Sequence, residues 1–201
     1  REMRVLVTGG AGFIGSHVVG AFVARGHQVW VVDDLSSGKR QNVPPQAELV
    51  VANIADPSVQ DLFMDAPFVL VSHHAAQIDV RVSVDQPAFD ASINVVGFVN
   101  LLEGAGAGGV ERVVFASSGG TVYGDPIEIP TPETAPNCPI SPYGASKLAG
   151  EHYARMLGAL NNFDAVSMRY SNVFGPRQDP TSPYSGVLSL FITALLEGKR
   201  P

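Results

Sequence analysis

Residues 3–15 read MRVLVTGGAGFIG, and this stretch decides the fold. Met3–Thr8 is a short apolar run rich in β-branched residues, and an apolar stretch of helical period follows over Phe13–Ala24. Between them, Gly9, Gly12 and Gly15 recur every three residues, which predicts a strand, a tight turn and a helix. The first glycine permits the turn, the second lets backbone N–H groups approach a pyrophosphate, and the third lets the helix pack closely on the strand. The stretch therefore predicts the start of a dinucleotide-binding unit.

The next strand supports that prediction. Gln28–Val32 is apolar and ends at Asp33, 18 residues after Gly15, where a carboxylate can accept both hydroxyls of a ribose. Asp33 would repel a 2′-phosphate, and no arginine follows it directly, so NAD is preferred over NADP. The nearby Lys39 and Arg40 leave NADP as an alternative.

Strand-like and helix-like stretches alternate along the remaining chain. The expected strands are Glu48–Ala52, Phe68–Ser72, Arg112–Ala116 and Ala165–Tyr170, and the expected helices are Ser83–Ala105, Ser141–Leu160 and Val187–Leu196. The strands are almost wholly apolar, as strands covered by helices on both faces must be. The chain is thus predicted to be an α/β protein, a Rossmann-type doubly wound parallel sheet with helices on both faces. We expect an NAD-binding domain over residues 1–170 and the start of an incomplete substrate-binding region over 171–201.

The segment Gly119–Pro142 interrupts this alternation with six prolines among polar residues. It predicts a long loop after the carboxyl end of a strand, which is where ligands bind in such sheets. A loop of this length in a compact domain is usually functional, so we expect it to border the site.

Tyr143 and Lys147 carry the predicted chemistry. They lie four residues apart, so a helix presents them on one face. A free phenol has a pKa of about 10, and a neighbouring cation favours its ionised form. Such a pair can remove a hydroxyl proton while a hydride leaves the same carbon. By itself the spacing is also typical of a surface helix with a solvated lysine, but the glycine turn and the serines at 117 and 118 favour the catalytic interpretation.

Composition limits the alternatives. The 201 residues suit one domain, and 13 basic against 19 acidic residues give a net charge of −6, which argues against nucleic acid or an anionic membrane as partner. No apolar run reaches the roughly 18 residues of a membrane helix. The single cysteine, Cys138, fits a reducing compartment, so the cytoplasm is expected. The five histidines show no metal-ligand spacing, and no metal is expected.

Seven motifs together resemble the extended short-chain dehydrogenase/reductase family, and within it the nucleotide-sugar epimerases, which include UDP-glucose 4-epimerase. They are TGGAGFIGSH at 8–17, DDLSSG at 33–38, HHAAQ at 73–77, NVVG at 94–97, SSGGTVYG at 117–124, SPYGASK at 141–147 and RYSNVFGPR at 169–177. The resemblance covers essentially the whole chain. It implies an isomerase of carbohydrate metabolism that withdraws a hydride from C4 of a nucleotide sugar, lets the keto sugar rotate and returns the hydride to the other face.

The resemblance also assigns roles to residues. Tyr143 would be the base, and Lys147 would lower its pKa and hold the ribose. Asn172 would contact the diphosphate of the sugar nucleotide, which we expect to be a UDP-sugar. The implied NAD contacts are Gly9, Gly12, Phe13, Ile14, Gly15, Asp33, Asp34, Ser37, Gly38, Asn53, Ile54, Ala75, Ala76, Gln77, Asn94, Tyr143 and Lys147. The helices 83–105 and 143–160 would pair with a second copy in a four-helix bundle, giving a homodimer.

Three departures from the family pattern qualify these expectations. The family usually has Asp-Ile where this chain has Asn53-Ile54, and its proton-relaying hydroxyl falls at Gly119, leaving Ser118 or Thr121 in that role. Members are also typically about half as long again. Two alternatives therefore stay open: an NAD-dependent sugar-nucleotide oxidoreductase that releases NADH, and a non-catalytic dinucleotide-binding domain. Glucose, N-acetylglucosamine and uronate donors are not distinguished.

Overall fold

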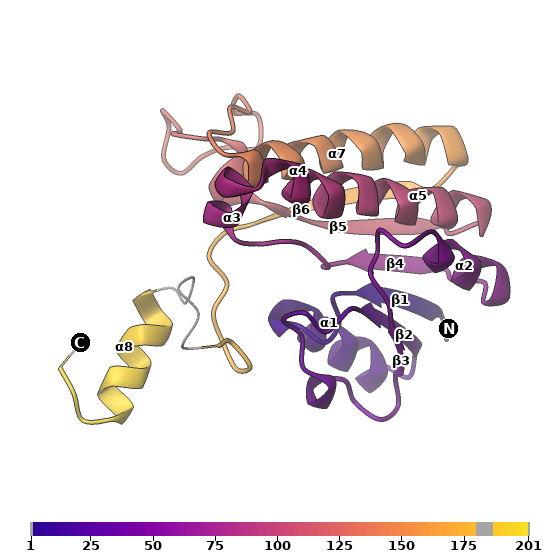
Figure 1. The fold of residues 1–201 in the computed structure, drawn as a ribbon, viewed down its shortest axis with the longest axis horizontal. Coiled ribbons are helices and arrows are strands. Elements are labelled where there is room, and N and C mark those ends of the chain that lie inside the picture. The colour runs from indigo at the N-terminus through magenta and orange to yellow at the C-terminus, as the bar shows by residue number, and fades with distance from the viewer. Residues whose placement is uncertain (1, 180–186, 201) are drawn as a thin grey trace.

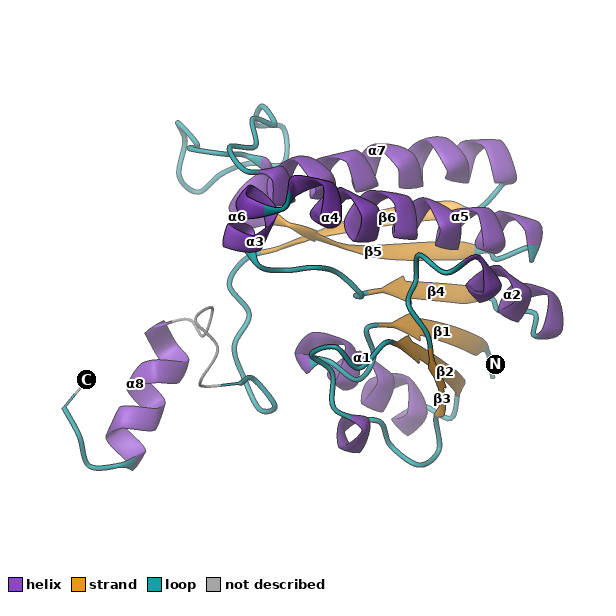
Figure 2. Cartoon of the chain, viewed as in Figure 1, coloured by secondary structure: helices purple, strands orange, loops and turns teal. Residues whose placement is uncertain are grey.

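A computed structural model describes residues 2–179 and 187–200 of the chain. The six strands among these residues form one parallel sheet (Figure 2). The strand order is β3-β2-β1-β4-β5-β6. The strands are β1 (Arg4–Thr8), β2 (Gln28–Asp33), β3 (Glu48–Val51), β4 (Leu70–His73), β5 (Arg112–Ser118) and β6 (Asp164–Tyr170). The order reverses between β1 and β4, so the carboxyl ends of these two strands flank the crevice in which such sheets bind ligands.

Helices lie on both faces of the sheet (Figure 1). The α-helices are α1 (Phe13–Ala24), α2 (Asp61–Asp65), α3 (Val80–Asp85), α4 (Pro87–Ala91), α5 (Phe98–Ala107), α6 (Gly119–Val122), α7 (Pro142–Asn161) and α8 (Val187–Leu196). Two 3₁₀ turns, η1 (Arg40–Asn42) and η2 (Pro57–Gln60), and one π-helix, η3 (Ser92–Gly97), complete the described elements. The predicted Rossmann-type fold is confirmed.

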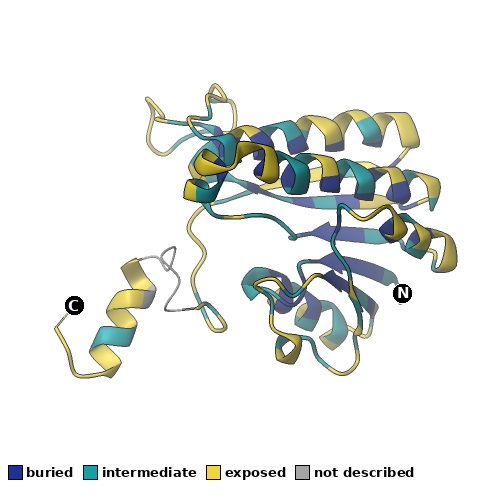
Figure 3. Ribbon diagram, in the orientation of Figure 1, coloured by how far each residue is buried: buried dark blue, intermediate teal, exposed yellow. Residues whose placement is uncertain are grey.

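Buried residues lie along the central strands and on the helices that cover them (Figure 3). Because side chains alternate along a strand, this core is divided into two clusters. Val5, Val7 and Val31 point to one face, where they pack against Val19 of α1. Their neighbour Leu6 points to the other face and joins the larger cluster. That cluster includes Val71, Val113 and Phe115 from strands, Phe63 from α2, Phe98, Leu101 and Leu102 from α5, and Ala154 from α7. Each fully buried side chain of this size contributes about 1.5–3 kcal/mol relative to exposure. Because β1 packs against α1 in the first cluster, this packing holds the turn between β1 and α1 in place.

The prediction of one continuous helix over 83–105 is wrong. The structure has α3, α4, η3 and α5 in succession, beginning at Val80 and ending at Ala107. Pro87 explains the first break, because proline has no N–H to continue the helical ladder and is favoured in the first turn of a new helix. The π-helix then widens one turn around Asn94.

The predicted loop 119–142 also begins differently. β5 extends to Ser118, and Gly119–Val122 forms the single turn α6, so the irregular segment starts at Tyr123. It ends where Ser141 caps α7 by accepting a hydrogen bond of 3.1 Å from the Gly144 N–H. This cap fixes the helix start that carries Tyr143.

The edge strand β6 contradicts the expectation that helices cover every strand on both faces. Val166 is 40% exposed and Met168 43% exposed. Because α1 packs on β1 and β2, the same face of β6 is left open among the described residues. The helix α8 has its predicted bounds, and its apolar side chains are also largely exposed.

Candidate active site

The glycine turn has the geometry that its sequence predicts. Gly9 adopts a left-handed conformation with φ of +67°, which glycine reaches without steric cost. A Cβ at Gly15 would overlap the carbonyl oxygen of Gly9, so only glycine lets α1 start this close to the turn. No side chain caps the N-terminus of α1. The helix therefore presents backbone N–H groups, and the positive end of its dipole, to an anion.

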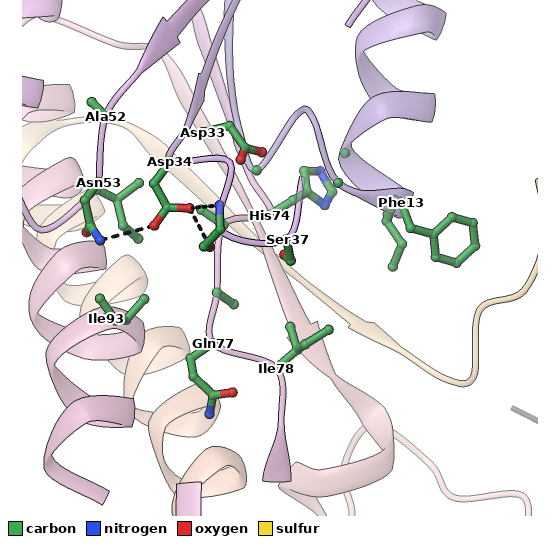
Figure 4. A pocket seen from close by; sticks show the side chains of 18 of the residues that line it. Phe13, Asp33, Asp34, Ser37, Ala52, Asn53, His74, Gln77, Ile78 and Ile93 are labelled. Carbon is green, nitrogen blue, oxygen red and sulfur yellow. Dashed lines mark hydrogen bonds between the residues drawn. The ribbon is translucent and has the colours of Figure 1, made fainter. Parts of the chain in front are cut away.

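The turn opens into a crevice of about 500 Å³ (Figure 4). Thirteen of the predicted cofactor residues line it: Gly9, Gly12, Phe13, Ile14, Gly15, Asp33, Asp34, Ser37, Asn53, Ile54, Ala75, Ala76 and Gln77. They come from the β1–α1 turn and from the segments that follow β2, β3 and β4. The structure thus brings four separate motifs to one cavity. The spacing of the glycines and of Asp33 indicated the first two motifs, and the family resemblance indicated the other two.

Asp33 and Asp34 are held by local hydrogen bonds. The Asp33 carboxylate accepts one bond from the Ala11 N–H and one from the Leu35 N–H, each of 2.9 Å, so each oxygen keeps acceptor capacity. Asp34 accepts from the amide of Asn53 at 3.3 Å. This contact gives a reason for the departure at Asn53, because an aspartate there would set two carboxylates against each other.

Four predicted cofactor residues are absent from this lining: Tyr143 and Lys147 line a neighbouring crevice, whereas Gly38 and Asn94 line neither. Gly38 lies behind Asp33, and a Cβ there would come within 2.7 Å of its Oδ1. Asn94 donates to the carbonyl of Gln77 and accepts from its N–H, both at 2.9 Å. Gly38 and Asn94 therefore support lining residues instead of facing the cavity.

A second crevice, of about 410 Å³, continues from the first and shares Gly12, Phe13, Ile14 and His74 with it. Its lining includes Ser118, Tyr143, Lys147, Asn172 and Arg177. The predicted catalytic pair, one candidate hydroxyl and the predicted substrate residue therefore share a cavity. Thr121, the other candidate hydroxyl, is absent from the lining. Its Oγ1 is buried without a partner among the described residues.

Lys147 and Tyr143 lie on one face of α7, as predicted. The Lys147 ammonium is 5.7 Å from the centroid of the Tyr143 ring and donates to the Ala116 carbonyl at 2.9 Å. Burial lowers the pKa of Lys147 to about 8, and Asp90 opposes that shift. Burial, with a smaller contribution from Asp90, raises the pKa of Tyr143 to about 12. The protein's own groups therefore do not acidify the phenol as we expected from the lysine.

The adjacent histidines differ in their environments. His73 lies in the core, stacked on Phe98 with ring centroids 4.4 Å apart, and its Nδ1 is 2.6 Å from Thr8 Oγ1. His74 lines both crevices. Burial and the Lys147 charge lower the pKa of both rings, that of His74 to about 4. Both imidazoles are neutral at pH 7.

Sequence reasoning missed three charged residues near the site. Glu151 binds Arg169 through two hydrogen bonds of 2.9 and 2.7 Å and also accepts from Ser117. Glu151 follows Lys147 by one helical turn, so helical spacing alone could have predicted that it lies near the site. Asp90 is fully buried behind α7 and is bonded to Ser146. No sequence pattern marks Asp90 as part of the site.

The described residues contain no group of three or more His, Cys, Asp or Glu side chains placed to hold a metal ion. Within the same residues, every helix is too short or too polar to cross a membrane.

A parallel sheet whose glycine turn opens beside a tyrosine–lysine pair defines a dinucleotide-binding domain of the short-chain dehydrogenase/reductase type. A sequence profile of the NAD dependent epimerase/dehydratase family matches residues 5–201, and the chain belongs to this family.

Similar proteins agree with that assignment. UDP-glucose 4-epimerase of Mycolicibacterium smegmatis is 47% identical over 202 residues, which cover 98% of this chain and 64% of that protein. The structure of Thermus thermophilus UDP-glucose 4-epimerase in complex with NAD matches with a TM-score of 0.91 and 47% identity, covering 98% and 64% of the two chains. The Thermotoga maritima UDP-glucose 4-epimerase structure with UDP-glucose gives a TM-score of 0.93 and 42% identity at the same coverage. The chain thus spans about 64% of the length of these relatives.

Proposed function

We propose that this chain binds NAD and, with it, interconverts the C4 epimers of a nucleotide sugar. The observation that carries the proposal is that the crevice at the glycine turn continues into the crevice lined by Tyr143 and Lys147. The relatives named UDP-glucose 4-epimerase, two of them solved with NAD or UDP-glucose, support the same activity.

The described residues fit the cofactor. The uncapped N-terminus of α1 suits the pyrophosphate, and the free acceptor capacity of Asp33 suits the two ribose hydroxyls. Within the described part of the chain, no lysine or arginine lines the first crevice, which favours NAD over its 2′-phosphorylated form. When bound, NAD supplies a ring that accepts and returns a hydride and that is positively charged when oxidised.

The chain itself supplies the proton chemistry. Tyr143 Oη takes the proton of the sugar's 4-hydroxyl and later returns it to the same oxygen. Because the pKa of the phenol is about 12 in the protein alone, this role needs further positive charge beside the ring. Lys147 contributes its ammonium, held in place by the Ala116 carbonyl, and its remaining N–H groups would be the donors to a ribose hydroxyl of the cofactor.

The second crevice suits the sugar nucleotide. Asn172 offers an amide, and Arg177 offers a guanidinium that matches a diphosphate. We place the NAD-binding domain at 1–170 and the start of the substrate-binding region at 171–201, of which 180–186 and 201 lie outside the described residues. We also propose a cytoplasmic location, with which the single free and exposed cysteine, Cys138, is compatible.

We assign the relay hydroxyl to Ser118, because Ser118 lines the crevice of Tyr143 and Thr121 does not. Replacing Ser118 by alanine is expected to slow epimerisation about 10²-fold, since a positioned proton-transfer group is lost. Replacing Thr121 by valine is the matched control. It should leave the rate unchanged and raise the free energy of unfolding by up to about 1 kcal/mol, because a buried unpaired hydroxyl is removed. Initial rates of epimerisation and urea unfolding of the two variants measure these effects. If T121V loses activity while S118A keeps the parent rate, the relay hydroxyl belongs to Thr121 instead.

We also propose a homodimer formed through the outer helices. Val96 of η3 and Met156 and Leu160 of α7 expose apolar side chains on these helices, and such surfaces favour association. Sedimentation should give twice the chain mass of 21.2 kDa. Met156→Glu should give the monomer, whereas Met64→Glu, the same change at an exposed position on α2, should stay dimeric. A monomeric parent chain refutes the dimer.

The experiment that tests the function is incubation of the chain with NAD and a panel of UDP-sugars, followed by NMR of the sugar C4 position. The proposal expects the C4 epimer to appear without net absorbance at 340 nm. Net NADH indicates the oxidoreductase alternative. Bound NAD with no epimer from any sugar indicates a non-catalytic binding domain.

A further inference from the structure

Glu151 is a largely buried carboxylate that lies outside all seven sequence motifs. It is on α7, and only 12% of its side chain is exposed. Its Oε1 accepts hydrogen bonds from the Ser117 hydroxyl at 2.5 Å and from Nε of Arg169 at 2.9 Å, and its Oε2 accepts one from Nη2 of Arg169 at 2.7 Å. Burial opposes ionisation of this carboxyl, but the hydrogen bonds from Arg169 and Ser117 outweigh burial and lower its pKa. Glu151 is therefore an anion at pH 7.

These hydrogen bonds join three elements at one point. Ser117 on β5 and Arg169 on β6 are direct neighbours in the parallel register of the two strands, and α7 packs on both strands. The guanidinium carbon of Arg169 also lies 4.7 Å from the centroid of the Tyr123 ring, at the start of the irregular segment after α6. One carboxylate thus ties α7 to the ends of β5 and β6 and, through Arg169, to that segment.

The carboxyl end of β5 has a neighbouring strand on one side only. β4 pairs with the first part of β5, so residues 116–118 pair with β6 alone. Two side chains of α7, one helical turn apart, hold this end from the helix. Lys147 donates to the Ala116 carbonyl at 2.9 Å, and Glu151 accepts from the hydroxyl of the next residue, Ser117. α7 therefore binds two consecutive residues of β5.

The direction of Ser118 depends on this contact. Successive side chains of a strand point to opposite faces of the sheet, so binding Ser117 to α7 directs Ser118 to the other face. There Ser118 lines the crevice of Tyr143. Glu151 and Arg169 line neither crevice, so they act on a bound ligand through the residues that they hold.

We propose that Glu151 is a positioning residue for the proton transfer. Its bonds to Ser117 and Arg169 fix the end of β5, and they thereby aim the Ser118 hydroxyl and the carbonyl that holds Lys147. The inference rests on the proposed function for its catalytic meaning. It adds to that function a charged pair behind the site, which sets the geometry of the proton relay without touching cofactor or sugar.

Glu151→Gln tests the proposal because it keeps the size of the side chain and removes its charge. The amide oxygen can take the place of Oε1, but the NH₂ group then faces Nη2 of Arg169, donor against donor. We expect kcat for epimerisation to fall about tenfold, since a misplacement of about 1 Å can cost up to about 10²-fold. The KM for the UDP-sugar and the NAD affinity should stay within about threefold, because both crevices keep their lining.

A second measurement needs neither cofactor nor sugar. The sequence has three lysines, and Lys39 and Lys199 are exposed, so NMR of lysine labelled with ¹³C at Cε gives one signal from the buried Lys147 and two references. We expect the Lys147 signal to shift in E151Q while the two reference signals stay in place. Because this measurement uses the chain alone, its failure is distinct from a failure of the chain to epimerise.

Asp164→Asn is the matched control. The Asp164 carboxylate pairs with Arg112 at 2.7 Å where β5 and β6 begin, and the two side chains are 70% and 54% exposed. D164N therefore also removes an ion pair of β6, but at the end of the sheet away from the site. It should keep the kcat and the Lys147 signal of the parent, and an equal change in D164N overturns the positioning role.

Ser117→Ala separates position from charge, and it decides the question if E151Q does not fold. It removes one hydroxyl and leaves the Glu151 charge in place. We expect its Lys147 signal to shift and its kcat to fall, both by less than in E151Q. An unshifted Lys147 signal in a folded E151Q or in S117A, or a shifted signal with the kcat of the parent, overturns the proposal.

Discussion

Tyr143→Phe will slow epimer formation about 10²- to 10⁴-fold and leave NAD affinity within about threefold. The change removes one hydroxyl, the group assigned to proton transfer, and this range is what such a group typically contributes. It keeps the ring beside Lys147 and the backbone hydrogen bond of 3.2 Å from the Tyr143 N–H to Ser83 Oγ. NMR progress curves and calorimetric titration with NAD measure the two quantities.

Tyr153→Phe is the matched control, because Tyr153 lies on the same helix with its side chain 38% exposed. It should keep the parent rate. Should Y143F retain more than a tenth of that rate, Tyr143 is not the base and the proposed chemistry fails.

Gly15→Ala will weaken NAD binding about 10²-fold and lower the free energy of unfolding by about 3 kcal/mol. The added Cβ overlaps the backbone oxygen of Gly9, which no side-chain rotation relieves. Overpacking of this kind typically costs 1–3 kcal/mol, and here the displaced atoms are those of the anion-binding turn itself. Titration calorimetry and urea unfolding give both numbers.

The same substitution at Gly20 provides the comparison. Gly20 lies five residues further along α1, and a Cβ there has no neighbour within 4 Å. G20A should bind NAD like the parent and gain up to about 1 kcal/mol from helix propensity. Equal NAD affinities in G15A and the parent exclude the turn as the pyrophosphate site.

Local signals explain why much of the fold could be predicted from the sequence. The apolar runs of β1 and β2, the glycines between them and the periodicity of α1 act within a few residues, and the bounds of α1 and α8 agree with the predictions. The break at Pro87 was missed because apolar residues continue on both sides of it. The turn α6 was missed because it begins with two glycines, which are poor helix formers. Whether a helix covers β6 depends on distant segments, so its open face had no local signal.

The site was predictable where motifs carry backbone geometry or helical spacing. Tyr143, Lys147 and Ser118 share a crevice as expected, but Thr121, only three residues from Ser118, faces away. The helical turn α6 directs the Thr121 side chain away from the crevice, and the amino-acid composition of this segment does not predict that turn. The electrostatics were less predictable still, because the pKa of Tyr143 depends on burial and on Asp90, 53 positions earlier in the sequence.

We propose that the chain withdraws a hydride from C4 of a nucleotide sugar and returns it to the opposite face. Incubation with NAD and UDP-glucose deuterated at C4 follows that hydride. The expected product is UDP-galactose that keeps the deuterium at C4, with no net NADH. Product that has lost the label, deuterated NADH that accumulates, or bound NAD with no product contradicts this proposal.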